Sequence, residues 1–290
     1  MSGQRRVVVV GGGNAGFSAA LAACEQGAGV VLLEKAAEEE AGGNSFYTAG
    51  AFRIAHGGAQ DLAPLLAPEE RGRLPVTDLP PYPAAAFRAD LERVTEGRTD
   101  PAMAEVLVGQ SREIADWLHA QGIRWRLMYE RQAYERAGRQ GFFGGLALGT
   151  VGGGKGLVER LGEAARRAGV EVRYEAPLRG FLGDGRGIEG VQVGSGSDAL
   201  EADAVVLAAG GFEADPGRRS RWLGADWAPA YVRGTPTNTG EVLELALGLG
   251  AAPYGDWRSC HGVAWDAGAP PGGGERRLTN QLTRQSYPLG

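Results

Sequence analysis

The sequence predicts an α/β fold built on a parallel sheet, and the first 34 residues carry most of that prediction. Residues 6–10 contain four valines and run into glycine, as a short buried strand does. Residues 14–26 read as an Ala-rich helix ended by Gly27, and residues 30–34 as a second buried strand. Strand, glycine turn, helix and strand in this order form a βαβ unit with parallel strands. The apolar run 204–211, which also ends in glycines, predicts another buried strand.

Periodicity and turn residues predict the rest of the chain. Residues 36–40 are a polar linker, and the proline-rich stretch 57–85 is irregular. The remaining expected elements are helices over 86–127, 155–168 and 241–249, a strand over 170–174, and a hairpin over 178–193 around GDGRG that gives a small β-meander.

Composition narrows the class of protein. The chain is mildly acidic, with 30 Lys plus Arg against 35 Asp plus Glu, which argues against nucleic acid as a partner. Two cysteines without metal or disulfide spacing fit a reducing cytoplasm. No apolar run is long enough for a membrane span, and we expect no metal site, since the acids 38–40 read as a solvated turn. Glycine makes up 49 of 290 residues, more than twice the usual ~7%, as expected where the backbone must approach a ligand.

The turn of the βαβ unit carries a dinucleotide-binding pattern. Gly11, Gly13 and Gly16 form G-x-G-x-x-G: the first permits a tight turn, the second admits a pyrophosphate, and the third lets helix and strand pack closely. The helix N-terminus then offers N–H groups to phosphate. Glu34, at the end of the second strand, can accept hydrogen bonds from ribose hydroxyls. The alternative is a glycine-rich turn beside a surface glutamate.

The stretch GGNSFYTAGAF, residues 42–52, favours a flavin over a nicotinamide. Asn44, Ser45 and Thr48 supply hydrogen-bond donors for a diphosphate, and small residues allow a flat ring to lie against the backbone. Backbone N–H groups of residues 49–51 could reach flavin N5. A hydrated surface loop is the alternative.

Several segments together resemble one family. VVVVGGGNAGFSAA, VVLLEKA, GGNSFYTAGAF, AVVLAAGGFEAD and TNTGEVLELALGLGA occur in the order of the flavoprotein subunits of fumarate reductases and succinate dehydrogenases. The chain is most similar to the soluble branch that contains tricarballylate dehydrogenase and the 3-ketosteroid dehydrogenases. The resemblance implies a Rossmann-like FAD-binding domain over 1–253, with a helical insertion at about 86–150, and the beginning of an α+β capping domain over 254–290.

The resemblance also implies site residues. Asn44 occupies the position at which membrane-bound relatives carry a flavin-linked histidine, so FAD should be noncovalent. Pro177 would face the adenine with a carbonyl but no N–H. His261 would be the catalytic residue that grips a substrate carboxylate, although a surface or structural role is the alternative; His56 and His119 have weaker claims, and His119 should be solvated on its helix. The expected FAD-binding residues are Gly11, Gly13, Asn14, Ala15, Gly16, Glu34, Lys35, Gly42, Gly43, Asn44, Ser45, Thr48, Ala49, Gly50, Pro177, Ala208, Ala209, Gly210, Gly240 and Glu241.

The implied reaction moves two hydrogens across a C–C bond of a small di- or tricarboxylate, with hydride passing to or from flavin N5. The implied partners are the carboxylate substrate and an electron acceptor, such as a separate membrane or iron–sulfur protein. The family's proton-transferring arginine is expected beyond Gly290, so we expect the 290-residue chain alone to be inactive. Three readings compete: a 3-ketosteroid dehydrogenase-type flavoenzyme, a noncatalytic FAD-binding module, and an NAD-dependent enzyme.

One motif is a decoy. GTVGGGKG, residues 149–156, nearly spells a phosphate-binding P-loop. Gly156 stands where Ser or Thr should bind magnesium, and we expect no apolar strand before it.

Overall fold

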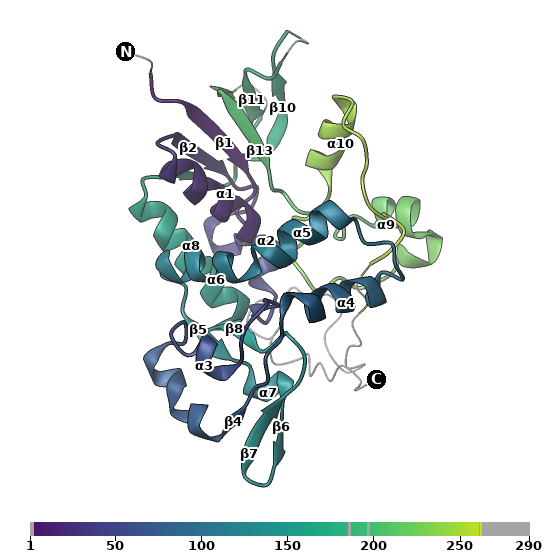
Figure 1. The fold of residues 1–290 in the computed structure, drawn as a ribbon. Coiled ribbons are helices and arrows are strands. Elements are labelled where there is room, and N and C mark those ends of the chain that lie inside the picture. Colours follow the sequence, from purple (N-terminus) through teal and green to yellow (C-terminus); the bar gives the residue numbers. More distant parts are fainter. Residues whose placement is uncertain (1–2, 185–186, 196–197, 261, 263–290) are drawn as a thin grey trace. The chain divides into compact units, whose positions relative to one another are not determined.

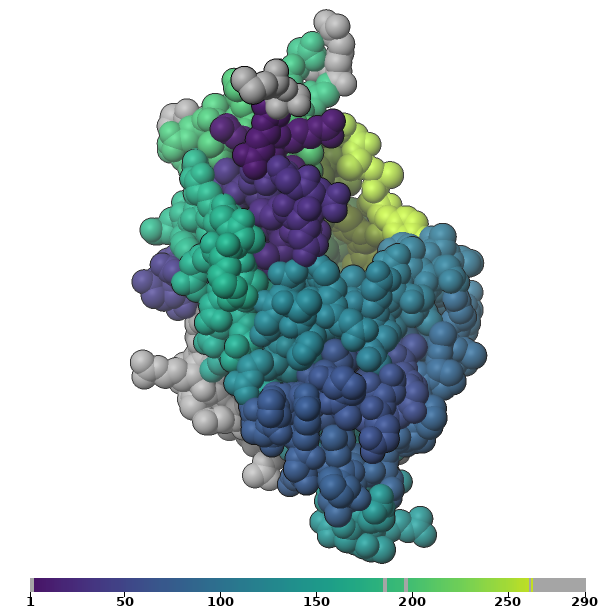
Figure 2. Space-filling model, turned by 60° about the vertical axis from the view of Figure 1, so that its left-hand side comes forward, coloured from purple at the N-terminus to yellow at the C-terminus, as the bar shows by residue number. Residues whose placement is uncertain are grey.

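The computed structural model describes residues 3–184, 187–195, 198–260 and 262. These residues divide into two compact units, one made of 3–48 with 161–262 and one made of 49–160. Figure 1 labels the elements along the chain. In the space-filling view of Figure 2, the purple N-terminal residues lie directly against green residues of the same unit that follow more than a hundred positions later.

A four-stranded parallel sheet with strand order β13-β1-β2-β9 forms the centre of the first unit. Val8 pairs with Val205 on one side and with Val31 on the other. The sheet and the helix that joins its first two strands confirm the predicted βαβ unit. The elements are β1 (Arg6–Val10), α1 (Asn14–Glu25), β2 (Gly29–Leu33), β9 (Glu171–Arg173) and β13 (Ala204–Leu207).

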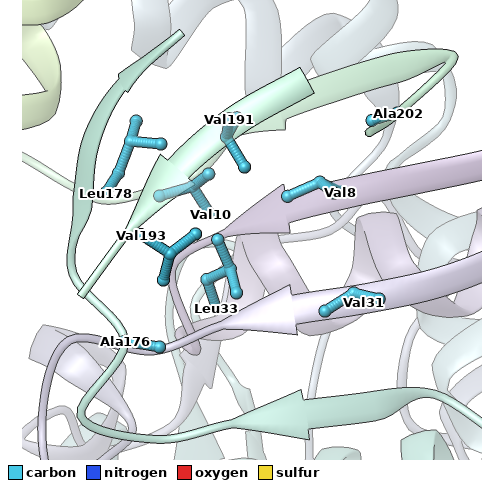
Figure 3. Packing of buried hydrophobic residues seen from close by; sticks show 9 residues of the cluster. All are labelled: Val8, Val10, Val31, Leu33, Ala176, Leu178, Val191, Val193 and Ala202. Atoms are coloured by element: carbon cyan, nitrogen blue, oxygen red, sulfur yellow. The ribbon is translucent and has the colours of Figure 1, made fainter. Parts of the chain in front are cut away.

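The predicted hairpin is part of an antiparallel meander that covers one face of this sheet. Its strands are β10 (Leu178–Leu182), β11 (Gly190–Val193) and β12 (Asp198–Glu201). Figure 3 shows Val8, Val10, Val31 and Leu33 of the sheet facing Val191 and its neighbours on the meander. Helix α10 (Glu241–Gly248) packs on the same core through Val242 and Leu245. Burying each such side chain contributes about 1.5–3 kcal/mol.

Helices cover the other face, as a parallel sheet requires. Helix α1 contacts β1, β2 and β13, and it buries Phe17, Ala20 and Leu21. Helix α8 (Gly153–Arg167) crosses from the second unit into the first, where Leu161 and Ala165 are fully buried.

A buried guanidinium organises the region between β13 and α10. Arg219 lies on α9 (Pro216–Leu223), just before the short helix η3 (Ala225–Trp227), and only 6% of its surface is exposed. It donates hydrogen bonds to four backbone carbonyls, those of Glu213, Trp227, Ala228 and Ala230. Each of those carbonyls would otherwise need another donor, so Arg219 fixes the course of residues 213–230.

The second unit holds two small sheets, with orders β3-β8-β5 and β4-β7-β6. Trp125 is fully buried in it and meets Phe52 edge to face, with 5.0 Å between ring centroids. Its elements are β3 (Ala51–Phe52), α3 (Ala59–Leu62), η2 (Pro68–Val76), β4 (Thr77–Asp78), α4 (Ala84–Val94), α5 (Pro101–Gly109), α6 (Ser111–Ala120), β5 (Trp125–Leu127), α7 (Tyr129–Gln132), β6 (Ala133–Arg136), β7 (Arg139–Phe142) and β8 (Leu148–Thr150).

Two expectations about this unit are wrong. The helical pattern over 86–127 is three helices, separated near Gly97 and Gln110, and residues 125–127 form a strand. Asp100 starts the second helix by accepting hydrogen bonds from the N–H groups of Ala102 and Met103. Residues 57–85, expected to be irregular, contain two helical turns and a strand.

A short strand overlaps the start of the decoy motif, where no strand was expected. Strand β8 contains Gly149 and Thr150 of the motif, is buried, and leads through Val151 and Gly152 into α8. The structure explains Gly156 by packing, because a Cβ there would lie 2.1 Å from the carbonyl oxygen of Val151. A hydroxyl-bearing side chain does not fit that position, so the magnesium ligand of a P-loop is still missing.

In the part of the chain that the structure covers, no helix combines the length and apolar character needed to cross a bilayer. Residues Glu38–Glu40 form the short helix η1, and all three are exposed. Across those same described residues, three or more His, Cys, Asp or Glu side chains nowhere gather as a metal site.

Candidate functional site

A cleft of about 850 Å³ opens at the carboxyl ends of the parallel strands, within the first unit. This is where open α/β sheets bind ligands. Four stretches far apart in the sequence meet there: the glycine turn before α1, the end of β2, the turn before β10, and the segments that follow β13. The lining residues are Val10–Ala15, Leu33–Ala37, Glu40, Gly43–Ser45, Glu175–Arg179, Ala208–Gly211, Glu213 and Thr235–Leu243.

The glycine turn is shaped as the motif predicts. Gly11 has φ +111°, and a Cβ there would lie 2.4 Å from the carbonyl oxygen of Ala208. Gly16 is buried under the turn, and its Cβ would lie 1.7 Å from the carbonyl oxygen of Gly11. Gly13 faces the cleft, where a Cβ would approach Ser45 Oγ at 3.4 Å. Any side chain at Gly11 or Gly16 would therefore push strand, turn and helix apart.

Glu34 is bound to the backbone on both sides. It is buried, its Oε2 accepts from the N–H of Gly12 at 2.8 Å, and its Oε1 accepts from the N–H of Ala36 at 2.8 Å. The carboxylate thus fixes the glycine turn against the end of β2. Each oxygen keeps a second lone pair, which is what a ribose hydroxyl would need.

The segment that was expected to be a flavin loop begins as a single helical turn, α2 (Gly43–Phe46). Ser45 Oγ accepts from the N–H of Asn14 at 2.9 Å, and Asn44 Oδ1 accepts from the N–H of Thr235 at 3.0 Å. Through these two bonds α2 connects the start of α1 to the opposite wall. The sequence suggested donors to a ligand here; the structure shows both side chains also organising the cleft.

Not every expected residue lies in the cleft. Gly42 and Thr48 belong to the same unit but do not line it, and Thr48 Oγ1 donates to the carbonyl oxygen of Ser45 at 2.9 Å. Ala49 and Gly50 belong to the second unit. His261 lies outside the described residues.

The two other histidines lie in the second unit. His119 is exposed on α6, as expected. His56 is buried and accepts from the N–H of Gly58 through Nδ1 at 3.1 Å. Burial lowers the pKa of His56; nearby Asp61 raises this pKa and Arg112 lowers it further.

The cleft carries more negative than positive charge. Five glutamates line it, with one lysine and one arginine. Burial raises the pKa of Glu241, but hydrogen bonds from Thr239 and Lys35 outweigh burial and leave the pKa below its usual range. A diphosphate would therefore have to be held by neutral donors and by the N-terminus of α1.

The residues present fit a dinucleotide. Three consecutive glycines leave a bare backbone cradle that a Cβ at Gly12 would fill, since it would lie 2.7 Å from Glu34 Oε2. Within the described residues, Asn14 Oδ1 is a buried oxygen without a hydrogen-bond partner, at the edge of this cradle. Such an orphaned acceptor indicates a missing donor at the site.

Comparison with known proteins decides which dinucleotide. Residues 6–266 match the family model described as FAD binding domain. The chain belongs to this family. FAD is therefore the cofactor.

The chain spans about a third to a half of the length of the following relatives. It is 32% identical over 186 residues to 4-oxocyclohexanecarboxylate 2-dehydrogenase of Sinomonas cyclohexanicum, a match that covers 58% of this chain and 31% of that protein. The fold is similar to the open conformation of a flavocytochrome c3 fumarate reductase, with 24% identity, a TM-score of 0.63, and 87% of this chain and 41% of that one covered. It is also similar to 3-ketosteroid-Δ4-(5α)-dehydrogenase from Rhodococcus jostii, with 19% identity, a TM-score of 0.66, and coverage of 86% and 54%.

Sequence reasoning named Gly240 and Glu241 in one wall of the cleft but not the residues before them. Thr235, Thr237 and Asn238 line it, and Asn238 Nδ2 donates to the carboxylate of Glu213, which lines it as well. A signal for this wall exists: TPTNTG, like GGNSFYTAG, combines glycine with hydroxyl and amide side chains just before a helix.

Proposed function

We propose that the protein is an FAD-dependent oxidoreductase acting on the C–C bond of a small di- or tricarboxylate, with tricarballylate as the first candidate. The supporting observation is the glycine-lined cleft of the first unit in a chain of the FAD binding domain family. When bound, FAD supplies a hydride acceptor and donor at N5. The chain spans about a third to a half of its relatives, so substrate and activity concern the whole protein.

This chain's own residues would bind and orient the cofactor. The backbone of Gly11–Gly13 and the start of α1 would hold the diphosphate, and Glu34 would accept from the adenosine ribose while still fixing the turn. Pro177, in the turn before β10, would lie at the adenine. Asn44 cannot form a covalent bond to flavin, so FAD would be held noncovalently.

The substrate would be bound outside this cleft, by a capping domain that begins at about residue 254. His261 is the candidate for gripping a carboxylate there, by charge and hydrogen bonding. Electrons would leave through a separate acceptor, such as a membrane or iron–sulfur protein.

A second candidate is the oxidation of a cyclic ketone. It is favoured by the match to 4-oxocyclohexanecarboxylate 2-dehydrogenase, a protein named for a substrate with both a ring ketone and a carboxylate. A ketone acidifies its neighbouring C–H bond, so either group could activate a CH–CH pair. The steroid dehydrogenase alternative belongs to the same chemistry, whereas a noncatalytic FAD-binding module would transfer nothing.

The test is anaerobic flavin bleaching. The whole protein, rather than the 290-residue chain alone, is loaded with FAD and mixed in turn with tricarballylate, succinate, 4-oxocyclohexanecarboxylate and a 3-ketosteroid, while flavin absorbance is followed. Loss of absorbance with a tricarboxylate or dicarboxylate supports the first proposal, and loss with a cyclic ketone alone supports the second. Retention of FAD without bleaching, and without reoxidation of reduced flavin by fumarate, would favour the noncatalytic module.

A further inference from the structure

A single ammonium group ties together two parts of the cleft wall that are 200 residues apart in the chain. Lys35 follows Glu34 at the end of β2. Its Nζ donates to the carbonyl oxygen of Thr237 at 3.2 Å, to Thr239 Oγ1, and to the carboxylate of Glu241 at 2.9 and 3.1 Å. All four residues line the cleft.

These contacts use the whole donor capacity of the lysine. An ammonium group has three N–H donors and no acceptor, and here three residues of one segment take them. Glu241 also neutralises its charge at 2.9 Å. Lys35 therefore has neither a donor nor an unbalanced charge left for a phosphate oxygen, although a lysine in a nucleotide cleft is usually regarded as a phosphate ligand.

Other bonds also hold the segment that Lys35 contacts: Arg218 Nη1 donates to the carbonyl oxygen of Thr239 at 2.6 Å, and the carbonyl oxygen of Asn238 accepts from the N–H of Ala214 at 3.0 Å. At the start of the segment, the N–H of Thr235 donates a hydrogen bond to Asn44 Oδ1. Within the segment, Thr235 Oγ1 and Thr237 Oγ1 lie 2.8 Å apart. At its C-terminal end, the segment passes through Gly240, whose φ is +83°, into α10. Lys35 thus joins this half of the segment to the end of β2, whereas Arg218 and Ala214 join it to the residues around α9.

We propose that Lys35 is a positioning residue for FAD: paired with Glu241, it holds residues 237–241 in place as the second wall of the cleft, and it does not bind phosphate directly.

A positioning role and a phosphate-binding role for Lys35 predict opposite effects of Glu241→Gln on FAD affinity. If Lys35 bound phosphate, Glu241→Gln would release the lysine and remove a repelling charge, so FAD would bind more tightly. If the pair positions the wall, Glu241→Gln and Lys35→Met each weaken FAD binding, about twofold to fivefold for a half-exposed pair, and the double variant is no weaker than either single one.

The experiment measures the FAD dissociation constant by flavin fluorescence for the unchanged chain, Lys35→Met, Glu241→Gln and the double variant. Amide hydrogen exchange of residues 235–242 is measured on the same proteins without FAD. We expect weaker, non-additive binding and at least threefold faster exchange in that segment for all three variants. Lys35→Arg, which keeps charge and donors, should restore both readouts to within twofold.

Asp78→Asn is the matched control, because it removes the charge from another exposed ion pair, with Arg139 in the second unit, at residues that do not line the cleft. Tighter or unchanged FAD binding in Glu241→Gln, additive losses in the double variant, or unchanged exchange in residues 235–242 would each overturn the positioning role. The inference rests on FAD binding in this cleft. An unchanged chain that binds no FAD would refute that premise, whereas the exchange measurement tests the tether by itself.

Discussion

Gly16→Ala is the sharpest test of the glycine turn, because it adds one methyl group at the closest approach in the cleft region. The new Cβ would lie 1.7 Å from the carbonyl oxygen of Gly11 and 2.9 Å from its carbonyl carbon. Real Cβ atoms essentially never approach closer than 3.0 Å, so helix α1 and the turn must separate by about 1.3 Å. Both clashing atoms are backbone, and neither can rotate away.

The expected cost follows from two opposing effects. Overpacking of this kind destabilises by about 1–3 kcal/mol, and a rigid backbone contact belongs at the upper end. Replacing glycine by alanine inside a helix returns about 1 kcal/mol. The net loss is therefore about 2 kcal/mol, which lowers the melting temperature of a chain of this size by roughly 4–8 °C.

Gly162→Ala is the matched control. It also lies inside a helix, α8, but its Cβ would lie 3.9 Å from Phe17 Cζ, an ordinary contact. It should raise the melting temperature by roughly 2–4 °C, since only the helix-propensity gain of about 1 kcal/mol applies. Thermal unfolding followed by circular dichroism measures both. If Gly16→Ala melts at or above the temperature of the unchanged protein, the close approach is not real and the shape of the turn is wrong.

Three further outcomes are expected. Glu34→Ala leaves two buried N–H groups without acceptors and should lower the free energy of unfolding in urea by about 2–4 kcal/mol. A decrease below 0.5 kcal/mol would contradict the two hydrogen bonds that Glu34 accepts. Arg219→Met removes the donor from four part-buried backbone carbonyls and should cost about 3–5 kcal/mol; equal sensitivity of residues 213–230 to protease before and after the change would contradict that. The pKa of His56 is lowered mainly by burial, so the unfolded chain binds its proton first as pH falls. Stability should therefore fall from pH 7 to pH 5, and His56→Asn should flatten that slope; an unaltered slope would show that His56 does not cause it.

The parallel sheet could be predicted because the residues of each strand form a recognisable pattern without reference to distant parts of the chain. Four valines running into glycine at Val10 are apolar on both faces, which only a strand covered on both sides can use. The strands of the second unit have no such local pattern. Strand β5 continues the helical spacing of the residues before it, and it becomes a strand because Trp125 and Leu127 pair with β8 far along the chain. Tertiary pairing of this kind overrides local propensity.

The residues of the candidate site also differ in whether local sequence spacing could predict their positions. Gly11, Gly16 and Glu34 could be placed from spacing, because the turn, the helix and the strand end are fixed relative to one another by a few residues of chain. The wall made by Thr235–Glu241 could be named only in part, since it reaches the cleft after 200 residues and is held there by Lys35 and Asn44. Sequence spacing carries no information about such a contact until the sheet brings its two ends together.

A diphosphate bound in this acidic cleft would have to be recognised at short range. Five glutamates against one lysine and one arginine repel an anion at long range, and Glu241 neutralises the lysine. Attraction must then come from contacts of a few ångströms: backbone N–H groups bared by glycine, and the first turn of α1. Such contacts depend on position far more steeply than a charge does. For this reason the cofactor site should be more sensitive to a methyl group at Gly16 or to a loosened wall at Glu241 than to the loss of any one cation.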